Sequence, residues 1–551
     1  MNKNDNLTII PIGGLEQIGA NCTMIGSGHE WIIVDLGITF YDKLGIEVLT
    51  PDMSYIKEHQ KDIKGIFVTH AHEDHIGAIH HLWQSIKCPV YLTEFPAAVL
   101  KQKLSDRRWK DDVQINVVNR RQRIKVGSFE IEFVALAHSV LGSCGLYIKT
   151  PTGTLFHTGD WKIDETPLLG DVIDVERLTE IGKEGVDCLL CDSTNMLTES
   201  HIGSEATVRE ALERVIAKYE HKRVTVTCFS SNVARIETIF YVARKLKRRV
   251  AIIGRSMYKM LDAVAETSYY TPKFRENVNS ILTDEEAMSM PADKVLLICT
   301  GSQGEARSAL YKLAKGENKV VKLSDDDVVI FSSKVIPGNE IGIRDLQNML
   351  LRQGVEIVTT DTEADIHVSG HPNKAAVAKM YEWLQPKTLM PVHGDARMLY
   401  AQEEFAKSRG ISEILVAESG DVVTYANGKL QKVSHRDMVF NAVDCGEVIP
   451  LNSEPIRERF SMTYGGHVSV SFVISGEELI DDPEISVHGI NANKKMLNRI
   501  NSGIYQIVKN EVAKGRDIEV MKRDVSYSVK KLIAQMLNKK PLTAVHIHQC
   551  A

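Results

Sequence analysis

A short run of histidines and acidic residues directly follows an apolar stretch near the N-terminus. Residues 65–68 read Gly-Ile-Phe-Val, which predicts a buried strand, and residues 70–75 then read His-x-His-x-Asp-His. Imidazole nitrogen and carboxylate oxygen are the ligand types that zinc prefers. Because a strand that ends in a tight turn aims neighbouring side chains in different directions, the pattern predicts two ions. An exposed polar loop is the alternative, and the spacing disfavours it. We assign His70 and His72 to one ion, and Asp74 and His75 to the other.

Isolated histidine and aspartate residues recur at the ends of later apolar stretches. His138, Asp160 and His393 each come directly after a segment that is expected to be a strand. We therefore assign His138 to the first ion and His393 to the second, with Asp160 bridging them. Two ions roughly 3.5–4 Å apart would activate water and hold both oxygens of an in-line displacement at phosphorus. His157, on the strand before Asp160, is expected to be a buried neighbour of the site rather than a ligand.

A second group of motifs lies between the last two ligands. Residues 367–371 read His-Val-Ser-Gly-His, where the glycine lets the backbone approach an anion and the hydroxyl and imidazoles supply donors. This predicts a phosphate site, with structural hydrogen bonding at a domain seam as the alternative. Arg255 also lies between the last two ligands, and its guanidinium offers a bidentate donor for a phosphate at a cleft that faces the substrate. The candidate phosphate-binding residues are His367, Val368, Ser369, Gly370, His371, Ser231, Asn232 and Arg255.

The order of the ligands resembles the metallo-β-lactamase superfamily, in which the His-x-His-x-Asp-His signature precedes a lone His, a lone Asp and a final His. In compact hydrolases of that superfamily the last two ligands lie close together, whereas more than 200 residues separate Asp160 from His393. A segment the size of a domain is therefore inserted. Its motifs are similar to those of the β-CASP branch, and the resemblance to the ribonuclease J family spans nearly the whole chain. The motifs that carry it are 190–194 (LCDST), 228–232 (CFSSN), 254–256 (GRS), 300–305 (TGSQGE) and 336–340 (IPGNE).

The resemblance implies two-metal hydrolysis of RNA, with 5′-to-3′ exonuclease and endonuclease activity in RNA maturation and decay. In the family, the His that matches His371, paired with the carboxylate that matches Asp192, protonates the leaving oxygen. A carboxylate-held imidazole suits that role near neutral pH. Asp74 is counted with them as catalytic. The expected ions are zinc, with manganese as the alternative. One departure is at Ala234, where the family usually has a His, so that discrimination of a 5′-monophosphate is expected to be shallow.

Two other functions share part of this pattern. A small-molecule metallohydrolase would use the same ligands but would leave the insertion and the phosphate segment unexplained. An RNA-binding scaffold subunit with weak activity would be expected to have lost metal ligands, and all seven candidates are present. The resemblance further implies assembly as a homodimer or homotetramer through the C-terminal domain. Whether a paralogous subunit is a partner is left open.

The expected fold class is α/β. It consists of a metallo-β-lactamase αββα sandwich, an inserted β-CASP α/β domain and a small α/β C-terminal domain that supports assembly. The sandwich is made of two separate parts of the chain, because the insertion interrupts it. The expected boundaries are 1–196 and 363–445 for the sandwich, 197–362 for the insertion, 446–459 for a linker and 460–551 for the C-terminal domain.

Composition is consistent with a large multidomain protein of the cytoplasm. The chain has 551 residues, 25% of them charged, and a net charge of −6. No apolar run approaches the length of a membrane span, and the N-terminus lacks a signal-like apolar core. An acidic total permits RNA binding where cations cluster locally. Of the nine cysteines, Cys188 and Cys191 form a CxxC pattern inside an apolar run, which favours core residues over a redox pair. The basic runs are Arg107, Arg108 and Lys110; Arg120, Arg121, Arg123 and Lys125; and Lys245, Lys247, Arg248 and Arg249.

Overall fold

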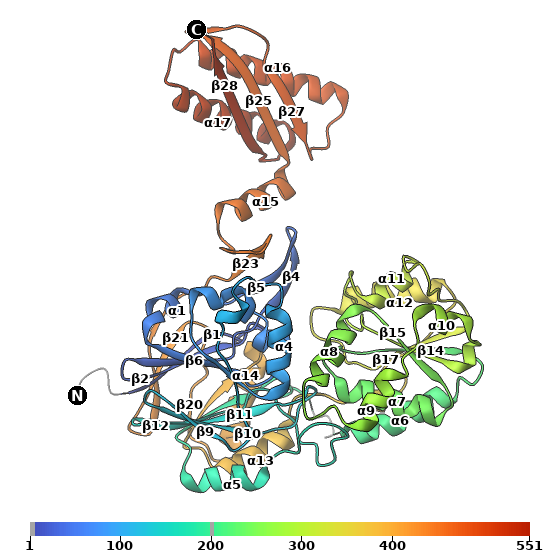
Figure 1. Ribbon diagram of the computed structural model, residues 1–551. Helices are drawn as coiled ribbons and strands as arrows, with labels where there is room; N and C mark the ends of the chain where they lie inside the picture. Colours follow the sequence, from blue (N-terminus) through green and yellow to red (C-terminus); the bar gives the residue numbers. More distant parts are fainter. Residues whose placement is uncertain (1–5, 199–202, 551) are drawn as a thin grey trace. The chain divides into compact units, whose positions relative to one another are not determined.

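The computed structural model describes residues 6–198 and 203–550 and is shown in Figure 1. The chain divides into two compact units. The first comprises Met1–Phe40 and Leu49–Phe440, and the second comprises Tyr41–Val48 and Asn441–Ala551. Within the described residues the strands form five sheets. None of the described helices has the length and apolar character needed to cross a membrane.

The first unit contains an eight-stranded sheet with the order β22-β21-β1-β2-β3-β6-β7-β8. Its strands from β22 to β3 pair antiparallel, whereas β3, β6, β7 and β8 run parallel. Helices α1 (Ser54–Glu58), α2 (Glu73–Ile76), α3 (Ile79–Leu82) and α4 (Glu94–Leu104) are inserted between its later strands. The strands are β1 (Leu7–Gly13), β2 (Cys22–Ser27), β3 (Glu30–Val34), β6 (Ile63–Phe67), β7 (Val90–Leu92), β8 (Ile115–Val117), β21 (Asp421–Ala426) and β22 (Lys429–His435).

A seven-stranded sheet with the order β20-β19-β13-β12-β11-β10-β9 packs against the first. Ile9 and Ile25 of the first sheet share one buried cluster with Ile131, Phe133 and Ile148 of the second. On the outer face, α5 (Val175–Glu184), α13 (Lys374–Leu384) and α14 (Ala396–Ser408) contribute to a separate cluster with β13. The predicted αββα sandwich is therefore confirmed. The strands are β9 (Arg123–Val126), β10 (Phe129–Ala135), β11 (Cys144–Thr150), β12 (Gly153–His157), β13 (Cys188–Asp192), β19 (Thr388–Val392) and β20 (Glu413–Ile414).

The two CxxC cysteines lie on β13, in the middle of this second sheet. Successive side chains of a strand point to opposite faces, so that Cys188 lies in the inner cluster and Cys191 in the outer one. Burial raises the pKa of the Cys188 thiol to about 12 and also raises that of Cys191. Both thiols are core groups that face away from each other, which rules out a redox pair.

The chain leaves the sandwich after β13 and returns with α13 and then β19, which pairs directly and in parallel with β13. Between them a five-stranded parallel sheet has the order β15-β16-β14-β17-β18. Its Val- and Ile-rich strands are buried on both faces, as expected for a parallel sheet covered by helices. The strands are β14 (Arg223–Thr227), β15 (Arg249–Ile253), β16 (Val295–Cys299), β17 (Asp327–Phe331) and β18 (Glu356–Val358).

Helices cover both faces of the inserted sheet. One buried cluster includes α6 (Glu205–Ala217), α7 (Val233–Lys245), α8 (Arg255–Ala265) and α9 (Pro272–Asn279). Phe95 and Val99 of α4 belong to the same cluster, so that apolar packing joins the insertion to the sandwich. The opposite face is covered by α10 (Asp284–Ser289), α11 (Ala309–Ala314) and α12 (Glu340–Arg352). Short 3-10 turns lie at Gln60–Asp62, Trp83–Ser85, Lys110–Asp112, Ala292–Lys294 and Ala364–Ile366.

The second unit contains the two remaining sheets. The hairpin β4 (Thr39–Lys43) and β5 (Ile46–Thr50) joins β23 (Asn441–Asp444) and β24 (Glu447–Pro450) in one of them. Residues 446–459, which we expected to be a linker, thus contain a strand and the start of α15 (Glu454–Gly465). In the other sheet β25 alternates buried and half-buried residues, which matches the alternation of apolar and polar residues in its sequence. That sheet and its helices are β25 (His467–Ser475), β26 (Glu478–Leu479), β27 (Glu484–His488), β28 (Leu542–Gln549), α16 (Lys494–Val512) and α17 (Ile518–Leu537).

Replacing Phe472 of β25 by Ala should loosen the second unit without affecting the first. Phe472 is buried in a cluster with Val470, Ile504 and Val525, and a Phe-to-Ala change in such a core costs about 3–5 kcal/mol. Amide hydrogen exchange should therefore accelerate in β25 and β28. The amides of the strands around the candidate site should keep their protection. Acceleration throughout the chain would show that the two units unfold together.

Candidate metal centre and phosphate site

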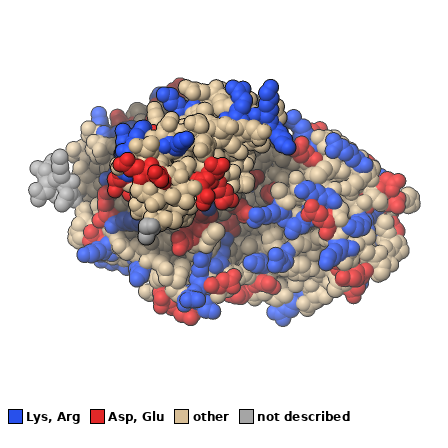
Figure 2. Space-filling model, turned by 90° about the horizontal axis from the view of Figure 1, so that it is seen from above, with Lys and Arg blue, Asp and Glu red and all other residues tan. Residues whose placement is uncertain are grey.

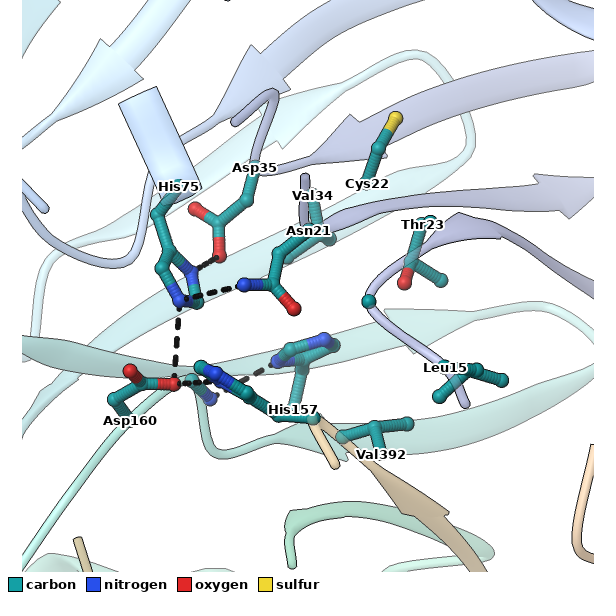
Figure 3. Close-up of a pocket in the computed structure, with 14 residues that line it drawn as sticks. Leu15, Asn21, Cys22, Thr23, Val34, Asp35, His75, His157, Asp160 and Val392 are labelled. Atoms are coloured by element: carbon teal, nitrogen blue, oxygen red, sulfur yellow. Dashed lines mark hydrogen bonds and ion pairs between the residues drawn. The ribbon is translucent and has the colours of Figure 1, made fainter. Parts of the chain in front are cut away.

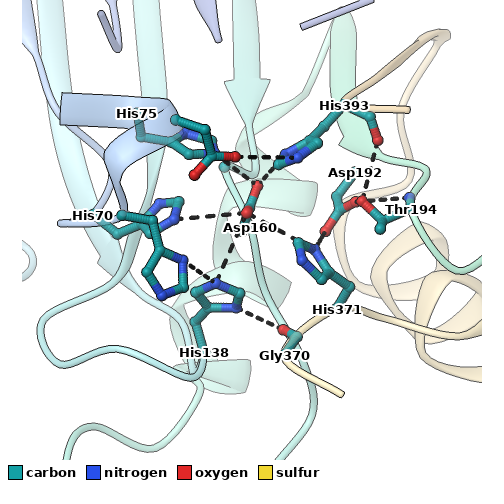
Figure 4. A network of polar contacts seen from close by, with 12 residues as sticks. His70, His75, His138, Asp160, Asp192, Thr194, Gly370, His371 and His393 are labelled. Carbon is teal, nitrogen blue, oxygen red and sulfur yellow. Dashed lines mark hydrogen bonds and ion pairs between the residues drawn. The ribbon is translucent and has the colours of Figure 1, made fainter. Parts of the chain in front are cut away.

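The seven predicted metal ligands lie together at one edge of the sandwich, at or just beyond strand ends. Their nitrogen and oxygen atoms form two groups, each with all ligand atoms within 4.8 Å of one another. Asp160 belongs to both groups and lies between the histidines in Figure 4. The first group is His70, His72, His138 and Asp160, and the second is Asp74, His75, Asp160 and His393.

Backbone contacts hold the loop that carries the first four ligands. The chain after β3 runs beside α2, with hydrogen bonds from Leu36 N to His75 O (2.7 Å) and from Ile38 N to Glu73 O (3.0 Å). Gly37 lies between these bonds, and a Cβ atom there would come within 1.7 Å of the Asp74 carbonyl oxygen. Only glycine therefore allows this approach.

The second nitrogen of several ligand imidazoles is held by the protein. His75 Nδ1 donates to Asp35 Oδ2 (2.7 Å), and His138 Nδ1 donates to the Gly370 carbonyl (2.6 Å). The Thr69 hydroxyl donates to Asp35 Oδ2 (2.8 Å) and accepts from His70 Nδ1 (3.0 Å). One carboxylate, Asp35, thus orients ligands of both groups. Figure 3 shows Asp35 beside His75.

Burial keeps the first group of imidazoles neutral. It lowers the pKa of His72 to about 4, and with the neighbouring histidines it lowers those of His70 and His138 well below the ordinary value. His70 Nε2 is buried and has no hydrogen-bond partner among the described residues. His72 Nδ1 and His138 Nε2 lie 3.0 Å apart. Neutral imidazole nitrogens that converge in this way are suited to a divalent transition metal.

The second group is more strongly charged. Burial opposes ionisation of Asp160, but the nearby His393 and His75 hold its pKa well below the usual range. His75 Nε2 lies 3.3 Å from Asp160 Oδ1 and 3.5 Å from Asp74 Oδ2. Asn21 Nδ2 donates to Asp74 Oδ2 (3.2 Å) and further fixes that carboxylate. Two carboxylates and two imidazoles form a donor set that also fits a divalent ion.

His157 belongs to neither group. It lines a small pocket behind the centre with Cys22, Thr23 and Val34 (Figure 3). Its Nδ1 accepts a hydrogen bond from Gly159 N (3.0 Å), and burial lowers its pKa to about 4. This neutral imidazole supports the turn that leads to Asp160.

Beside the second group, His371 and Asp192 form a tight pair. His371 Nδ1 lies 2.8 Å from Asp192 Oδ2, and the other carboxylate oxygen accepts from Thr194 N (2.9 Å) and Thr194 Oγ1 (2.7 Å). Burial opposes protonation of His371, but the charges of Asp192 and Asp160 raise its pKa to about 9. His371 Nδ1 also lies 3.8 Å from Asp160 Oδ2. His371, with its raised pKa, lies next to the candidate metal ligands, and Figure 4 shows its position beside Asp160.

The segment His367–His371 bends around His138. A Cβ atom on Gly370 would come within 2.8 Å of His138 Cε1, so that glycine permits the close approach. Asn195 Nδ2 donates to Ser369 Oγ (2.8 Å), and His371 N donates to the same oxygen (3.2 Å). These hydrogen bonds correspond to the structural role that the sequence left open as the alternative to a phosphate site. The Ser369 hydroxyl proton remains available to a ligand.

At the start of the segment, His367 carries a buried Nδ1 without a partner among the described residues. Burial and the charge of Arg235 lower its pKa to about 3. The imidazole is therefore neutral. Val368 packs at the edge of the apolar cluster of the inserted domain.

The remaining candidates for phosphate binding follow the carboxyl ends of two strands of the inserted sheet. Ser231 and Asn232 come after β14, and Arg255 comes after β15. The Asn232 side chain accepts from Arg235 N (2.9 Å) and caps α7, so its oxygen is already used. Ser231 is half-buried, and Arg255 is exposed at the first residue of α8 without an ion pair to any described residue. Ala234 instead lines a pocket with His138, Lys162 and Glu205. The position where the family has a His thus lies beside the first metal group.

Many side chains of the basic runs form ion pairs or hydrogen bonds within the protein. Arg120 pairs with Asp171, Arg121 with Asp174 and Arg123 with Glu132. Arg248 is buried, and its guanidinium donates to main-chain carbonyls. In the face seen in Figure 2, Lys and Arg side chains alternate with Asp and Glu. Many side chains of these runs therefore already have partners within the protein.

Replacing Asp35 by Asn should weaken metal binding. The change keeps the shape of the side chain but removes the charge that holds His75 and, through Thr69, His70, and losses of this kind typically cost about 10–100-fold in metal affinity. Chelator competition with metal analysis measures the change. Asp421 is the matched control, since it is also buried and contacts His435 Nδ1 at 2.7 Å, away from the ligand groups. Equal effects of Asp35→Asn and Asp421→Asn would contradict the assignment.

Four models of known protein families match successive parts of the chain. They are the metallo-beta-lactamase superfamily (residues 16–218), the ribonuclease J beta-CASP domain (221–350), the Zn-dependent metallo-hydrolase RNA specificity domain (362–416) and the ribonuclease J C-terminal domain (455–550). Together the matched regions account for most of the chain.

Similar proteins cover nearly the full length. Ribonuclease J of Sinorhizobium meliloti is 36% identical, with 99% of this chain and 98% of that protein aligned. Ribonuclease J of Synechocystis is 34% identical over 88% of this chain and 76% of the relative, and that of Helicobacter pylori is 31% identical over 100% and 80%. A solved structure of an Enterococcus faecalis protein of unknown function is 16% identical, with a TM-score of 0.53 over 76% of this chain and all of its own. That likeness concerns the fold alone.

Proposed function

Because the chain belongs to the ribonuclease J family and is thus a metal-dependent RNA nuclease, we propose that it hydrolyses RNA with two divalent ions. The cleavage proposed is both 5′-to-3′ exonucleolytic and endonucleolytic, in RNA maturation and decay in the cytoplasm. One observation supports this most directly: two ligand groups share Asp160, and the His371–Asp192 pair lies beside them. Assembly as a homodimer or homotetramer through residues 460–551, with or without a paralogous subunit, belongs to the same proposal.

In this proposal His70, His72 and His138 hold one ion, and Asp74, His75 and His393 hold the other, with Asp160 shared. Zinc fits the donor set, and manganese is the alternative. When bound, the ions supply Lewis-acid activation of water and of the phosphoryl oxygens. Asp35 and Thr69 keep the imidazoles oriented toward the ions.

The proton for the leaving oxygen comes from His371. Asp192 holds the imidazole in its protonated form, and Thr194 fixes Asp192 in turn. The segment His367–His371 holds the phosphate, with the Ser369 hydroxyl and the neutral His367 as polar groups. Asp74 contributes both as a ligand and through its contact with His75.

A 5′-terminal phosphate is bound farther out, by Ser231, Asn232 and Arg255. Support comes from their place at the carboxyl ends of parallel strands, where α/β sheets commonly bind ligands. Arg255 carries a guanidinium without an ion pair to a described residue, at the first turn of a helix. Asn232 would contribute its amide N–H groups, because its oxygen caps α7.

The decisive experiment is digestion of one RNA with a labelled 5′ end, bearing a monophosphate, a triphosphate or a hydroxyl group. The nuclease should release labelled mononucleotide from the monophosphate end and internal fragments from all three, and chelation should abolish both products. RNA binding without cleavage would support a scaffold subunit. Hydrolysis of small esters without cleavage of RNA would support a small-molecule metallohydrolase.

Replacing His371 by Ala should reduce RNA cleavage by about 10²–10⁴-fold, the usual contribution of a general acid. Metal content should stay unchanged, because His371 is not among the seven ligands. Single-turnover cleavage and metal analysis of the same preparation measure both effects. Loss of metal in the variant would make His371 a ligand and would require a new assignment of the second group.

Replacing Arg255 by Ala should reduce the preference for a 5′-monophosphate over a 5′-hydroxyl end. A hydrogen bond to a charged group is worth about 1.5–3 kcal/mol, so the ratio of the two rates should fall by roughly one to two decades. Lys259 is the matched control, since it is an exposed cation one turn further along α8. If Lys259→Ala lowered the ratio equally, the effect would come from general electrostatics and the pocket would lie elsewhere.

A further inference from the structure

A fully buried arginine of the inserted domain contacts the backbone at the start of the phosphate segment. Arg235, in the first turn of α7, is 0% exposed. Its Nη1 donates to the carbonyl and hydroxyl oxygens of Ser332 (2.9 and 2.5 Å) and to the Ile366 carbonyl (3.4 Å). The Ser332 hydroxyl donates to the same Ile366 carbonyl (2.6 Å). Two donors thus fix the carbonyl that directly precedes His367.

The charge of this arginine is balanced by one carboxylate. Arg235 Nε and Nη2 donate to the two oxygens of Glu205, each at 3.0 Å. Burial opposes ionisation of Glu205, but the charges of Arg235 and Lys162 lower its pKa to about 2. A buried charge is tolerated only when it is paired in this way. The pair therefore locks the start of α6, where Glu205 is the first residue, to α7.

The same helix start is tied to the strand end that carries Asp160. The Asp164 carboxylate accepts from Ser204 Oγ (2.8 Å) and Glu205 N (3.3 Å), and it lies 3.0 Å from Lys162 Nζ. Lys162 is buried two residues after Asp160, and its backbone N–H donates to the Ala137 carbonyl (2.7 Å), next to His138. A continuous series of buried contacts thus leads from the metal ligands to the phosphate segment.

We propose that Lys162, Asp164, Glu205, Arg235 and Ser332 form a positioning network that fixes His371 relative to Asp160. The inference rests on the proposed function, since its consequence is the placement of His371 as the proton donor. The inserted domain then sets the geometry of proton transfer as well as binding RNA. All five are positioning residues that act through the segment His367–His371.

A second buried ion pair in the same domain provides a matched control. Arg223 Nε and Nη2 donate to the two oxygens of Asp327 (2.6 and 2.8 Å), and both residues are buried. They are the first residues of β14 and β17, whereas Arg235 and Ser332 lie beyond the carboxyl ends of those strands. The two pairs thus share chemistry and burial and differ in which end of the sheet they occupy.

The test compares two double variants of the full-length protein loaded with zinc. Glu205→Leu with Arg235→Met removes the network pair, and Asp327→Leu with Arg223→Met removes the control pair; replacing both partners leaves no unpaired charge. Each is assayed on RNA and on a p-nitrophenyl phosphodiester, whose leaving group needs little protonation. A displaced acid should lower the RNA rate by about 10–100-fold and spare the ester, because small misplacements of reacting groups are costly. The control pair should leave the ratio of the two rates unchanged, and metal content should be unchanged in both.

Ser332→Ala provides a test that keeps every charge. It removes one of the two donors to the Ile366 carbonyl and should lower the ratio of the RNA rate to the ester rate by about threefold to tenfold. If the network double variant fails to fold, this variant decides the question. If His371→Ala lowered the ratio of the RNA rate to the ester rate but the folded network variants left it unchanged, only the positioning network would be overturned. If His371→Ala itself left the ratio unchanged, the proton-donor assignment would fail and the inference with it.

Discussion

The carboxylate of Asp160 is the group around which the centre is arranged. It is buried, and its oxygens lie within 3.3–3.8 Å of imidazole nitrogens of His70, His75, His138 and His371, with His393 in closer contact. An ionised carboxylate without water around it requires donors or cations on every side. Those groups come from the ends of strands in both sheets and from the segment that follows the insertion. The sandwich can satisfy Asp160 only when all of these parts are in register.

The grouping of the candidate ligands was predictable because their positions follow from strand geometry. His138, Asp160 and His393 each come after an apolar stretch. The strands before them, β10, β12 and β19, run in the same direction, so that their carboxyl ends meet at one edge of the second sheet. The αββα sandwich and the inserted domain were implied by the family resemblance that the ligand order and the long gap before His393 carry. The alternation of apolar and polar residues along β25 also matches its alternating burial, because the period of a strand is short and local.

The supporting groups could not be predicted in the same way. Asp35 also follows a buried strand, yet a single aspartate after a strand is common, and nothing local shows that it will contact His75 from 40 positions away. Glu205 and Arg235 belong to two helices, and neither lies near Ile366 in sequence. The segment 446–459 lacks periodicity, but β24 gains its order from β23, which lies in one sheet with β5. The contacts of Asp35, Glu205 and Arg235 and the pairing of β23 with β5 join distant parts of the chain.

The direct pairing of β19 with β13 also determines when the centre forms. Cys188 is aligned with Thr388 in a parallel ladder, and roughly 200 residues are made between the two strands. At a synthesis rate of about 5–20 residues per second, some 10–40 seconds pass before β19 can join its partner. During that interval β13 has an open edge and His393 does not yet exist. The inserted domain is therefore synthesised in full before the chain carries His393, the last of its seven candidate metal ligands.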